Sequence, residues 1–203
     1  MNEHELKQIA AMLKQMDYAA GDALRRNNLP GAILAYEQMM DAELAIGLEK
    51  NAGRTRINLA NLYLQVNRNE KALEHARRAS DALARFGAFE DVINARLTMA
   101  RCLCALDRHA DGIREAENAL RDCRTDAVRG EAYLVLAECE RLAGDRWKAR
   151  NAADRAVRCF EGVNNQSGLA RALYERISLL EQNGQSAAAA ADRARLAIIN
   201  SKL

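Results

Sequence analysis

Histidines are few in this chain, and their spacing limits the chemistry available to it. The three histidines, His4, His75 and His109, lie far apart, and none has another ligand residue four positions away. The helical zinc site of metalloproteases is therefore excluded. His109 lies beside Asp107 and Asp111, as a general base lies beside its orienting carboxylate. These residues fall in a predicted turn, where polar side chains are expected anyway, so we predict no catalysis there.

The cysteines do not form the pattern of a disulfide framework or a metal site. Their number is odd and their spacing irregular: Cys102, Cys104, Cys123, Cys139 and Cys159. Cys102 and Cys104 form a C-x-C motif within a helical pattern, which points the two thiols to different sides and gives poor metal geometry. We expect small hydrophobic side chains in or near a core. Reduced thiols fit a cytoplasmic protein.

Other signatures of enzymes, membranes and nucleic-acid binding are absent from the sequence. It contains no P-loop, no G-x-G-x-x-G and no G-x-S-x-G motif, so we predict no enzyme and no cofactor. The N-terminus lacks the basic start of a signal peptide, and no uncharged apolar stretch is long enough to span a membrane. The net charge is only +2, and arginines alternate with acidic residues, which disfavours nucleic acid as a partner.

The composition predicts helices throughout the chain. Alanine, leucine and arginine dominate, aromatic residues make up 4%, and Pro30 is the only proline. Alanine, leucine and arginine lose little rotamer freedom in a helix. Windows rich in β-branched residues are few, so the fold class is predicted to be all-α.

A repeated helix–turn–helix figure runs through the sequence. It is clearest in residues 57–79, and two small residues per unit mark it. The small residue of the second helix recurs at nearly even intervals, at Ala32, Ala72, Gly112, Ala149 and Ala190. The small residue of the first helix precedes it by the same interval in every unit, at Ala20, Ala60, Ala100, Ala137 and Ser178.

Close packing explains this spacing. Two antiparallel helices approach closely only where both carry small side chains, and each hairpin leaves an apolar face that the next hairpin must cover. We predict one domain over residues 1–203, with about five hairpins and ten helices. The repeat units are expected at residues 3–48, 51–87, 89–123, 126–162 and 166–201.

The repeat resembles the tetratricopeptide repeat (TPR). The second unit matches its pattern of large, small and aromatic positions with Leu59-Ala60, Tyr63, Ala72 and Ala76. The long period is similar to that of the long-repeat subclass common in bacterial transcription activators, peptide-sensing regulators and kinesin-light-chain-like arrays. This resemblance implies a right-handed superhelical solenoid whose first helices line a concave groove for a peptide or protein segment.

The periodicity of the first helices predicts which residues face this groove. Asn and Gln side chains can pair with an extended peptide backbone, and Arg101 and Arg141 can bind carboxylates. The predicted groove consists of Arg54, Ile57, Asn61, Leu64, Gln65, Asn94, Leu97, Arg101, Glu131, Leu134, Glu138, Arg141, Glu175 and Gln182.

Two features lie outside the predicted groove. Trp147 opens the second helix of the fourth unit and is expected to be a partly buried packing residue. On the last helix Leu196 and Ile198 fall on different sides, so both sides are partly apolar. Either this helix joins two copies in a homodimer or docks a partner, or it is a short helix with modest exposed aliphatic area.

Two functions are compatible with these patterns. The first is a cytoplasmic scaffold or adaptor that binds a protein or peptide partner and catalyses nothing. The second is a regulatory sensor subunit whose superhelix responds to a small peptide or signal and controls a separate effector. Stabilisation by a short peptide alone would favour the sensor, and stabilisation only by a folded protein would favour the adaptor.

Overall fold

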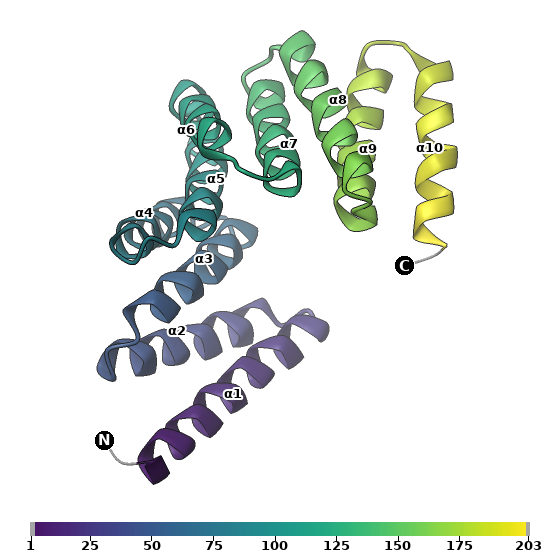
Figure 1. Ribbon diagram of the computed structural model, residues 1–203. Helices are drawn as coiled ribbons and strands as arrows, with labels where there is room; N and C mark the ends of the chain where they lie inside the picture. Colours follow the sequence, from purple (N-terminus) through teal and green to yellow (C-terminus); the bar gives the residue numbers. More distant parts are fainter. Residues whose placement is uncertain (1–2, 202–203) are drawn as a thin grey trace. The chain divides into compact units, whose positions relative to one another are not determined.

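Helices account for almost all of the described chain. The computed structural model describes the backbone of residues 3–201, and the side chains from Glu5 to Ser201 except that of Leu6. Ten α-helices occupy this part of the chain (Figure 1). Their bounds are α1 Glu3–Arg25, α2 Leu29–Ala45, α3 Glu49–Gln65, α4 Asn69–Arg85, α5 Phe89–Ala105, α6 His109–Asp122, α7 Asp126–Leu142, α8 Arg146–Gly162, α9 Gln166–Gln182 and α10 Ser186–Asn200.

The turns set the period of the fold. A residue with a left-handed backbone, with φ between 53° and 88°, follows successive helices at even spacing at Asn27, Gly47, Asn67, Gly87 and Asp107, and again at Gly144, Asn164 and Gly184. Asparagine, aspartate and glycine adopt this conformation most readily. Each such turn closes with a backbone hydrogen bond, as from Leu48 N to the Glu43 carbonyl at 2.8 Å. Within each series, such turns alternate between the turn inside a hairpin and the turn that leads to the next hairpin. Every second turn therefore marks one hairpin.

The helix α6 interrupts this period. It has 14 residues, three fewer than the 17 of α2–α5 and α7–α9. The chain leaves it through Cys123 in an extended conformation, with φ −64° and ψ 124°. The side chain of Thr125 then accepts a hydrogen bond from Val128 N and begins α7. The shorter α6 explains why Ala149 follows Gly112 more closely in the sequence than Gly112 follows Ala72.

Other helix starts are capped in the same way. The side chains of Asn28, Asp145 and Asn165 accept hydrogen bonds of 3.0, 3.0 and 2.9 Å from backbone N–H groups in the first turn of the following helix. Pro30 lies in the first turn of α2, where its missing N–H group costs nothing.

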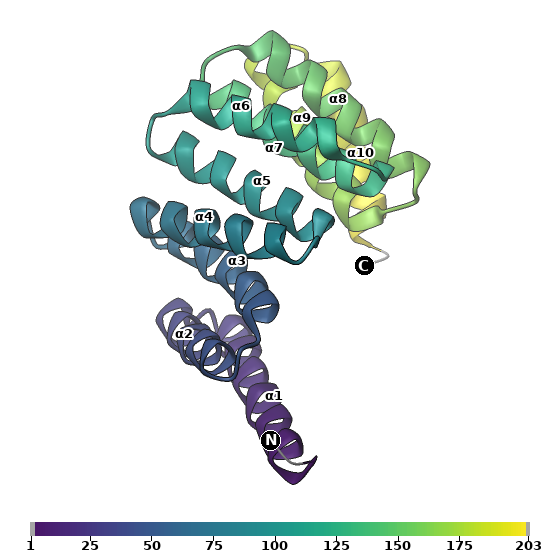
Figure 2. The ribbon, with the colours of Figure 1, turned by 60° about the vertical axis from the view of Figure 1, so that its left-hand side comes forward.

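The chain forms two compact units, Met1–Cys102 and Leu103–Leu203. The first contains α1–α4 and most of α5, and the second contains the end of α5 and α6–α10. Within each unit, consecutive helices run antiparallel and stack as hairpins, as two views show (Figures 1 and 2). No helix of residues 3–201 is long and apolar enough to cross a membrane.

Small residues lie where the helices approach each other in the first, second and fourth hairpins, as the repeat predicted, and each of these hairpins lies within one compact unit. Buried positions without exposed surface include Ala20, Ala32, Ala60, Ala72, Ala100, Ala137 and Ala149, and Gly112 is also buried. In the second compact unit an apolar cluster surrounds the buried ring of Phe160 and includes Leu134, Val157, Leu169 and Leu173. These contacts hold α7, α8 and α9 together.

The fifth hairpin differs from the prediction by one residue. The buried pair is Ile177 and Ala189, whereas Ser178 is half-buried and Ala190 is exposed. The turn glycine Gly184 is the equivalent of Gly144 in the fourth hairpin and sets this register. The assignment of Ser178 and Ala190 as the small pair is therefore wrong, because the second helix begins one residue earlier than the alanine pattern indicated.

Candidate functional site: the first-helix faces

In the second compact unit, two ion pairs join α7 to α9. The guanidinium of Arg171 donates two hydrogen bonds to the carboxylate of Glu131, at 2.9 and 2.8 Å. The Nε atom of Arg141 donates to Glu175 at 2.6 Å, and the Glu175 side chain is mostly buried. Charged pairs of this geometry are stronger than neutral hydrogen bonds. The two pairs link the first-helix surface of α7 to that of α9.

Tyr174 lies on this surface, between two of the paired residues. It directly precedes Glu175 and lies one helical turn after Arg171, and 70% of its surface is exposed. Gln182, further along α9, donates a hydrogen bond to Ser178 at 3.3 Å. An exposed aromatic side chain on a surface held by ion pairs is a favourable anchor for a partner.

Sequence reasoning missed Arg171 and Tyr174 because of the register of the fifth hairpin. With Ser178 as the small residue, the groove positions of α9 fall on Glu175 and Gln182. With Ile177 in that place, Arg171 and Tyr174 occupy the positions that Glu131 and Leu134 occupy in the preceding hairpin. The equivalent placement of the turn glycines Gly144 and Gly184 is the signal that identifies them.

In the first compact unit, an ion pair also crosses between first helices. The guanidinium of Arg54 on α3 donates from Nε to the carboxylate of Asp91 on α5 at 2.8 Å. Gln65 and Asn94 are not fully covered, and Asn61 and Arg101 are half-buried. The polar groove residues predicted for this unit thus reach its surface, with Arg54 paired to a neighbouring helix.

Two predicted groove residues belong to the core instead. Leu97 is 3% exposed and Leu134 is 2% exposed, so neither can contact a ligand. Leu134 packs in the cluster around Phe160. Ile57 and Leu64 are half-buried, and Ile57 packs against the cluster of buried Leu83. Projection of a helical period overestimates exposure here because the neighbouring first helix covers one edge of each stripe.

The charged residues near the end of α7 are only partly accessible. Glu138 is half-buried. Arg141, predicted to bind a ligand carboxylate, already binds Glu175. A ligand carboxylate would have to compete with this pair. Apolar and aromatic contacts are consequently the better source of affinity on this face than charge alone.

His109 and the cysteines have defined surroundings in the structure, and the Nε2 atom of His109 lies 3.8 Å from an oxygen of the Asp107 carboxylate. Asp111 pairs with Arg108 and Arg114, at 2.6 and 2.5 Å, rather than orienting His109. The side chain of His4 lies outside the described residues. All five cysteines are free thiols, and no group of three His, Cys, Asp or Glu among the described residues could hold a metal ion.

The two thiols of the C-x-C motif have different surroundings on α5. Burial raises the pKa of Cys102 to about 12. A hydrogen bond with Cys139, assisted by His109 against the effect of burial, lowers the pKa of Cys104 to about 7. Both side chains are nonetheless buried.

Comparisons with known proteins identify the fold. No protein-family model and no curated protein sequence matches the chain. Solved structures do match it, among them a Rap protein in complex with the competence and sporulation factor, with TM-score 0.81 and 17% identity over 90% of this chain and 52% of that one. The Rap conjugation gene regulator of plasmid pLS20, in complex with the Phr* peptide, matches with TM-score 0.82 and 15% identity over 100% and 57%.

In a third match the alignment covers almost the whole of both chains. A putative kinesin light chain from Podosopora anserina, with nearly identical TPR-like repeats, matches with TM-score 0.68 and 15% identity over 94% of this chain and 95% of that one. The present chain spans about half the length of the two Rap structures. These likenesses establish an all-α fold of sequential TPR-like hairpins.

Proposed function

We propose that this protein is a cytoplasmic scaffold or adaptor that binds a peptide or protein segment on its first-helix faces and catalyses nothing. The observation that carries the proposal is the exposed ring of Tyr174 on a surface fixed by the Glu131–Arg171 and Arg141–Glu175 ion pairs. Tyrosine supplies a large contact area at a low cost in conformational entropy. The TPR-like fold supports this reading, since such hairpin arrays present extended binding surfaces.

The ion pairs give the mechanism of binding. Because they join α7 to α9 before binding, the surface has little conformational freedom to lose when a segment lies across it. The Tyr174 ring would cover an apolar side chain of the partner. The polar side chains around it would pair with the partner's backbone.

A second candidate function is a regulatory sensor of the long-repeat type, which binds a small peptide and controls a separate effector. The specific observation in its favour is the fold likeness to two Rap structures that were solved with a factor or peptide bound. The same first-helix faces would serve in both functions. The two differ in whether a short peptide alone suffices as the ligand.

A matched pair of variants tests the proposed face. Tyr174→Ala and Tyr18→Ala each remove an exposed tyrosine, because both rings are 70% exposed. Immobilised wild-type protein would select ligands from a peptide library and from lysate, and calorimetry would give affinities for the selected ligands. We expect Tyr174→Ala to weaken binding at least about tenfold, as for an aromatic anchor, and Tyr18→Ala to leave it unchanged.

Equal binding by wild type and Tyr174→Ala would place the binding surface elsewhere and overturn the proposal. Selection of short peptides that also raise the unfolding temperature would favour the sensor. Selection of folded proteins alone would favour the adaptor.

A further inference from the structure

The side chain of Trp147 is exposed, contrary to the packing role expected from the sequence. It lies in the first turn of α8, and 74% of its surface is accessible. It is also the only tryptophan of the chain. Tryptophan is among the residues most enriched at the centres of protein interfaces, so its exposure needs an explanation. The surface around it, on the second-helix layer of the second compact unit, is not part of the first-helix face.

A pocket of about 470 Å³ begins at Trp147 and follows α8. Its walls are residues at helical spacing on one side of α8, and Arg176 of α9 forms its floor. The lining consists of Trp147, Arg150, Asn151, Asp154, Arg158 and Arg176. From Trp147 to Arg158 the helix rises by about 16 Å. That length accommodates about five residues of an extended chain.

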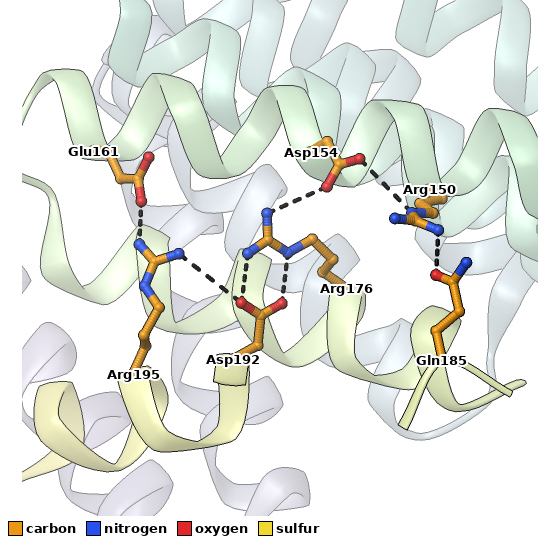
Figure 3. Close-up of polar contacts among 7 residues, drawn as sticks. All are labelled: Arg150, Asp154, Glu161, Arg176, Gln185, Asp192 and Arg195. Carbon is orange, nitrogen blue, oxygen red and sulfur yellow. Dashed lines mark hydrogen bonds and ion pairs between the residues drawn. The ribbon is translucent and has the colours of Figure 1, made fainter. Parts of the chain in front are cut away.

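The floor of the pocket is a network of ion pairs that is already satisfied (Figure 3). Arg176 donates to both carboxylate oxygens of Asp192, at 2.7 and 2.6 Å, and to Asp154 at 3.2 Å. Asp192 and Arg176 are largely buried. Fully paired groups of this kind shape the pocket but are not available to a ligand.

Two further contacts complete the network. Arg195 of α10 pairs with Glu161 of α8 and lies 3.9 Å from Asp192 (Figure 3). Arg150 contacts the neutral side chain of Gln185, and its distance to Asp154 is 3.9 Å. The carboxylates of this layer are thus used by the network, and Arg150 is held only loosely.

Arg158 is the arginine of the pocket that takes no part in the network. It is exposed, and no carboxylate within the described part of the chain lies within ion-pair distance of it. Among the charged residues of the pocket and its network, the four arginines Arg150, Arg158, Arg176 and Arg195 outnumber the three carboxylates Asp154, Glu161 and Asp192. The surplus positive charge lies at the end of the pocket away from Trp147.

We propose that this pocket is a second docking surface, which takes an acidic segment of a partner protein. An apolar or aromatic side chain of the segment stacks on Trp147, and a carboxylate at the other end of the segment binds Arg158. Arginine binds carboxylates in two-point geometry, and tryptophan offers a large apolar face. The site goes beyond the proposed function because it lies on the second helices and needs no residue of the first-helix face.

Nucleic acid fits this pocket less well than an acidic peptide. A phosphate backbone carries a negative charge at every nucleotide and needs cations along its whole path. Here Asp154 lies in the middle of the stripe, and Glu161 lies beyond Arg158 on the same helix. A peptide can carry its acidic residues at one end only, as the pocket requires.

The single tryptophan provides a direct readout of binding. The probe is a synthetic peptide, Phe-Ser-Gly-Ser-Glu-Glu, capped at both ends and titrated into the full-length protein at low salt while Trp147 fluorescence is recorded. A matched peptide with two lysines in place of the glutamates and a short single-stranded DNA are titrated in parallel. We expect a saturable change with the acidic peptide, with Kd below about 1 mM, that weakens as salt is added.

Charge reversal at Arg158 tests the carboxylate contact, because the fluorescent residue remains. We expect Arg158→Glu to weaken the acidic peptide at least about tenfold. Arg77→Glu, which changes an exposed arginine on α4, and Tyr174→Ala, which removes the anchor of the other face, should leave the affinity unchanged. Trp147→Ala should abolish binding in calorimetry.

Three results would overturn the proposal. They are an absence of saturable change with the acidic peptide, equal affinity for wild type and Arg158→Glu, or binding of the DNA or the lysine peptide in preference to the acidic one. Loss of peptide binding in Tyr174→Ala but not in Arg158→Glu would also place the ligand on the first-helix face. Failure of the two proposals is therefore distinguishable.

Discussion

The guanidinium of Arg176 and the carboxylate of Asp192 face each other across the fifth hairpin through two hydrogen bonds, of 2.7 and 2.6 Å. In the fourth hairpin the equivalent positions are Leu136 and Ala152, which belong to one apolar cluster. The fifth hairpin thus contains a largely buried ion pair where its neighbour has an apolar contact.

This relationship predicts that replacing Arg176 alone lowers the free energy of unfolding more than replacing both Arg176 and Asp192. Arg176→Leu leaves the buried carboxylate of Asp192 with only Arg195 at 3.9 Å, and we expect it to lower the free energy of unfolding by about 3 kcal/mol. The double variant Arg176→Leu, Asp192→Ala copies the fourth hairpin and removes the uncompensated charge. We expect it to recover most of the loss in urea unfolding.

An exposed pair in the same hairpin serves as the control. Arg193 pairs with Glu181, and both side chains are well exposed. Arg193→Leu should change stability by less than about 1 kcal/mol, because water screens such pairs. If Arg176→Leu lowers the free energy of unfolding by no more than Arg193→Leu does, the buried Arg176–Asp192 pair is no more important for the stability of the hairpin than an exposed pair.

The sequence pattern predicted the hairpins well because two local signals agree in most units. Small residues mark the helix contacts, and Asn, Asp or Gly with left-handed backbones mark the turns. In the fifth hairpin the alanine run 187–191 offers several equivalent small residues, so the pattern of small residues alone cannot select Ala189. The turn at Gly184 selects it, because a one-residue slip would move the left-handed conformation off glycine.

The binding surfaces were less predictable, for a different physical reason. Helical periodicity places a residue on one side of its helix but does not say how much of that side a neighbouring helix covers. Leu97 and Leu134 are covered, whereas Tyr174 and Trp147 are not. The Arg176–Asp192 pair was not predicted from the sequence either, because charged residues are interpreted as solvent-facing until their partner is known.

The ring of Phe160 explains two glycines within helices of the second compact unit. A Cβ atom at Gly168 on α9 would lie 2.5 Å from the ring of Phe160, and one at Gly130 on α7 would lie 2.8 Å from it. We predict that Gly168→Ala lowers stability by about 1 to 3 kcal/mol through overpacking, although alanine favours helix by about 1 kcal/mol. Thermal unfolding measures the change.

A third glycine provides the matched control for this prediction. A Cβ atom at Gly162, the last residue of α8, would meet no atom within 4 Å. Gly162→Ala should therefore be neutral or raise stability by up to about 1 kcal/mol. Phe160→Leu should reduce the cost of Gly168→Ala when the two are combined. A stabilising Gly168→Ala would contradict the assigned contact.

The helix α10 is the surface through which we propose that two copies associate. Ile198 is 57% exposed, and small residues continue its exposed surface at Ala187, Ala188, Ala190, Ala191, Ala194 and Ala197. Sedimentation velocity should show a dimer whose dissociation constant rises at least about tenfold in Ile198→Glu. A monomer at high concentration for wild type would rule the homodimer out, and Ile9→Glu on α1 is the control that should not affect association.

Glu43 makes the stability of the first compact unit depend on pH. It is buried on α2 and accepts a hydrogen bond of 2.8 Å from the hydroxyl of Thr55 on α3. Burial raises the pKa of Glu43, and the Thr55 hydrogen bond offsets only part of that effect. The folded protein therefore binds this proton more tightly than the unfolded chain does. Its contribution to stability is greatest below the ordinary glutamate pKa, about 4.3, and is lost as pH rises through the raised pKa.

Glu43→Gln isolates this contribution, because glutamine stays neutral and can still accept the Thr55 hydrogen bond. We expect the variant to be more stable than wild type at pH 7, with a difference that disappears as the pH falls toward 4. Thr55→Val keeps the shape of the side chain but removes the donor, and should cost about 1 to 3 kcal/mol at pH 7. Thermal unfolding of the three proteins between pH 4 and 8 measures both effects. A difference between wild type and Glu43→Gln that does not change with pH would mean that the carboxyl titrates alike in both states, since only a pKa that differs between them couples folding to protons.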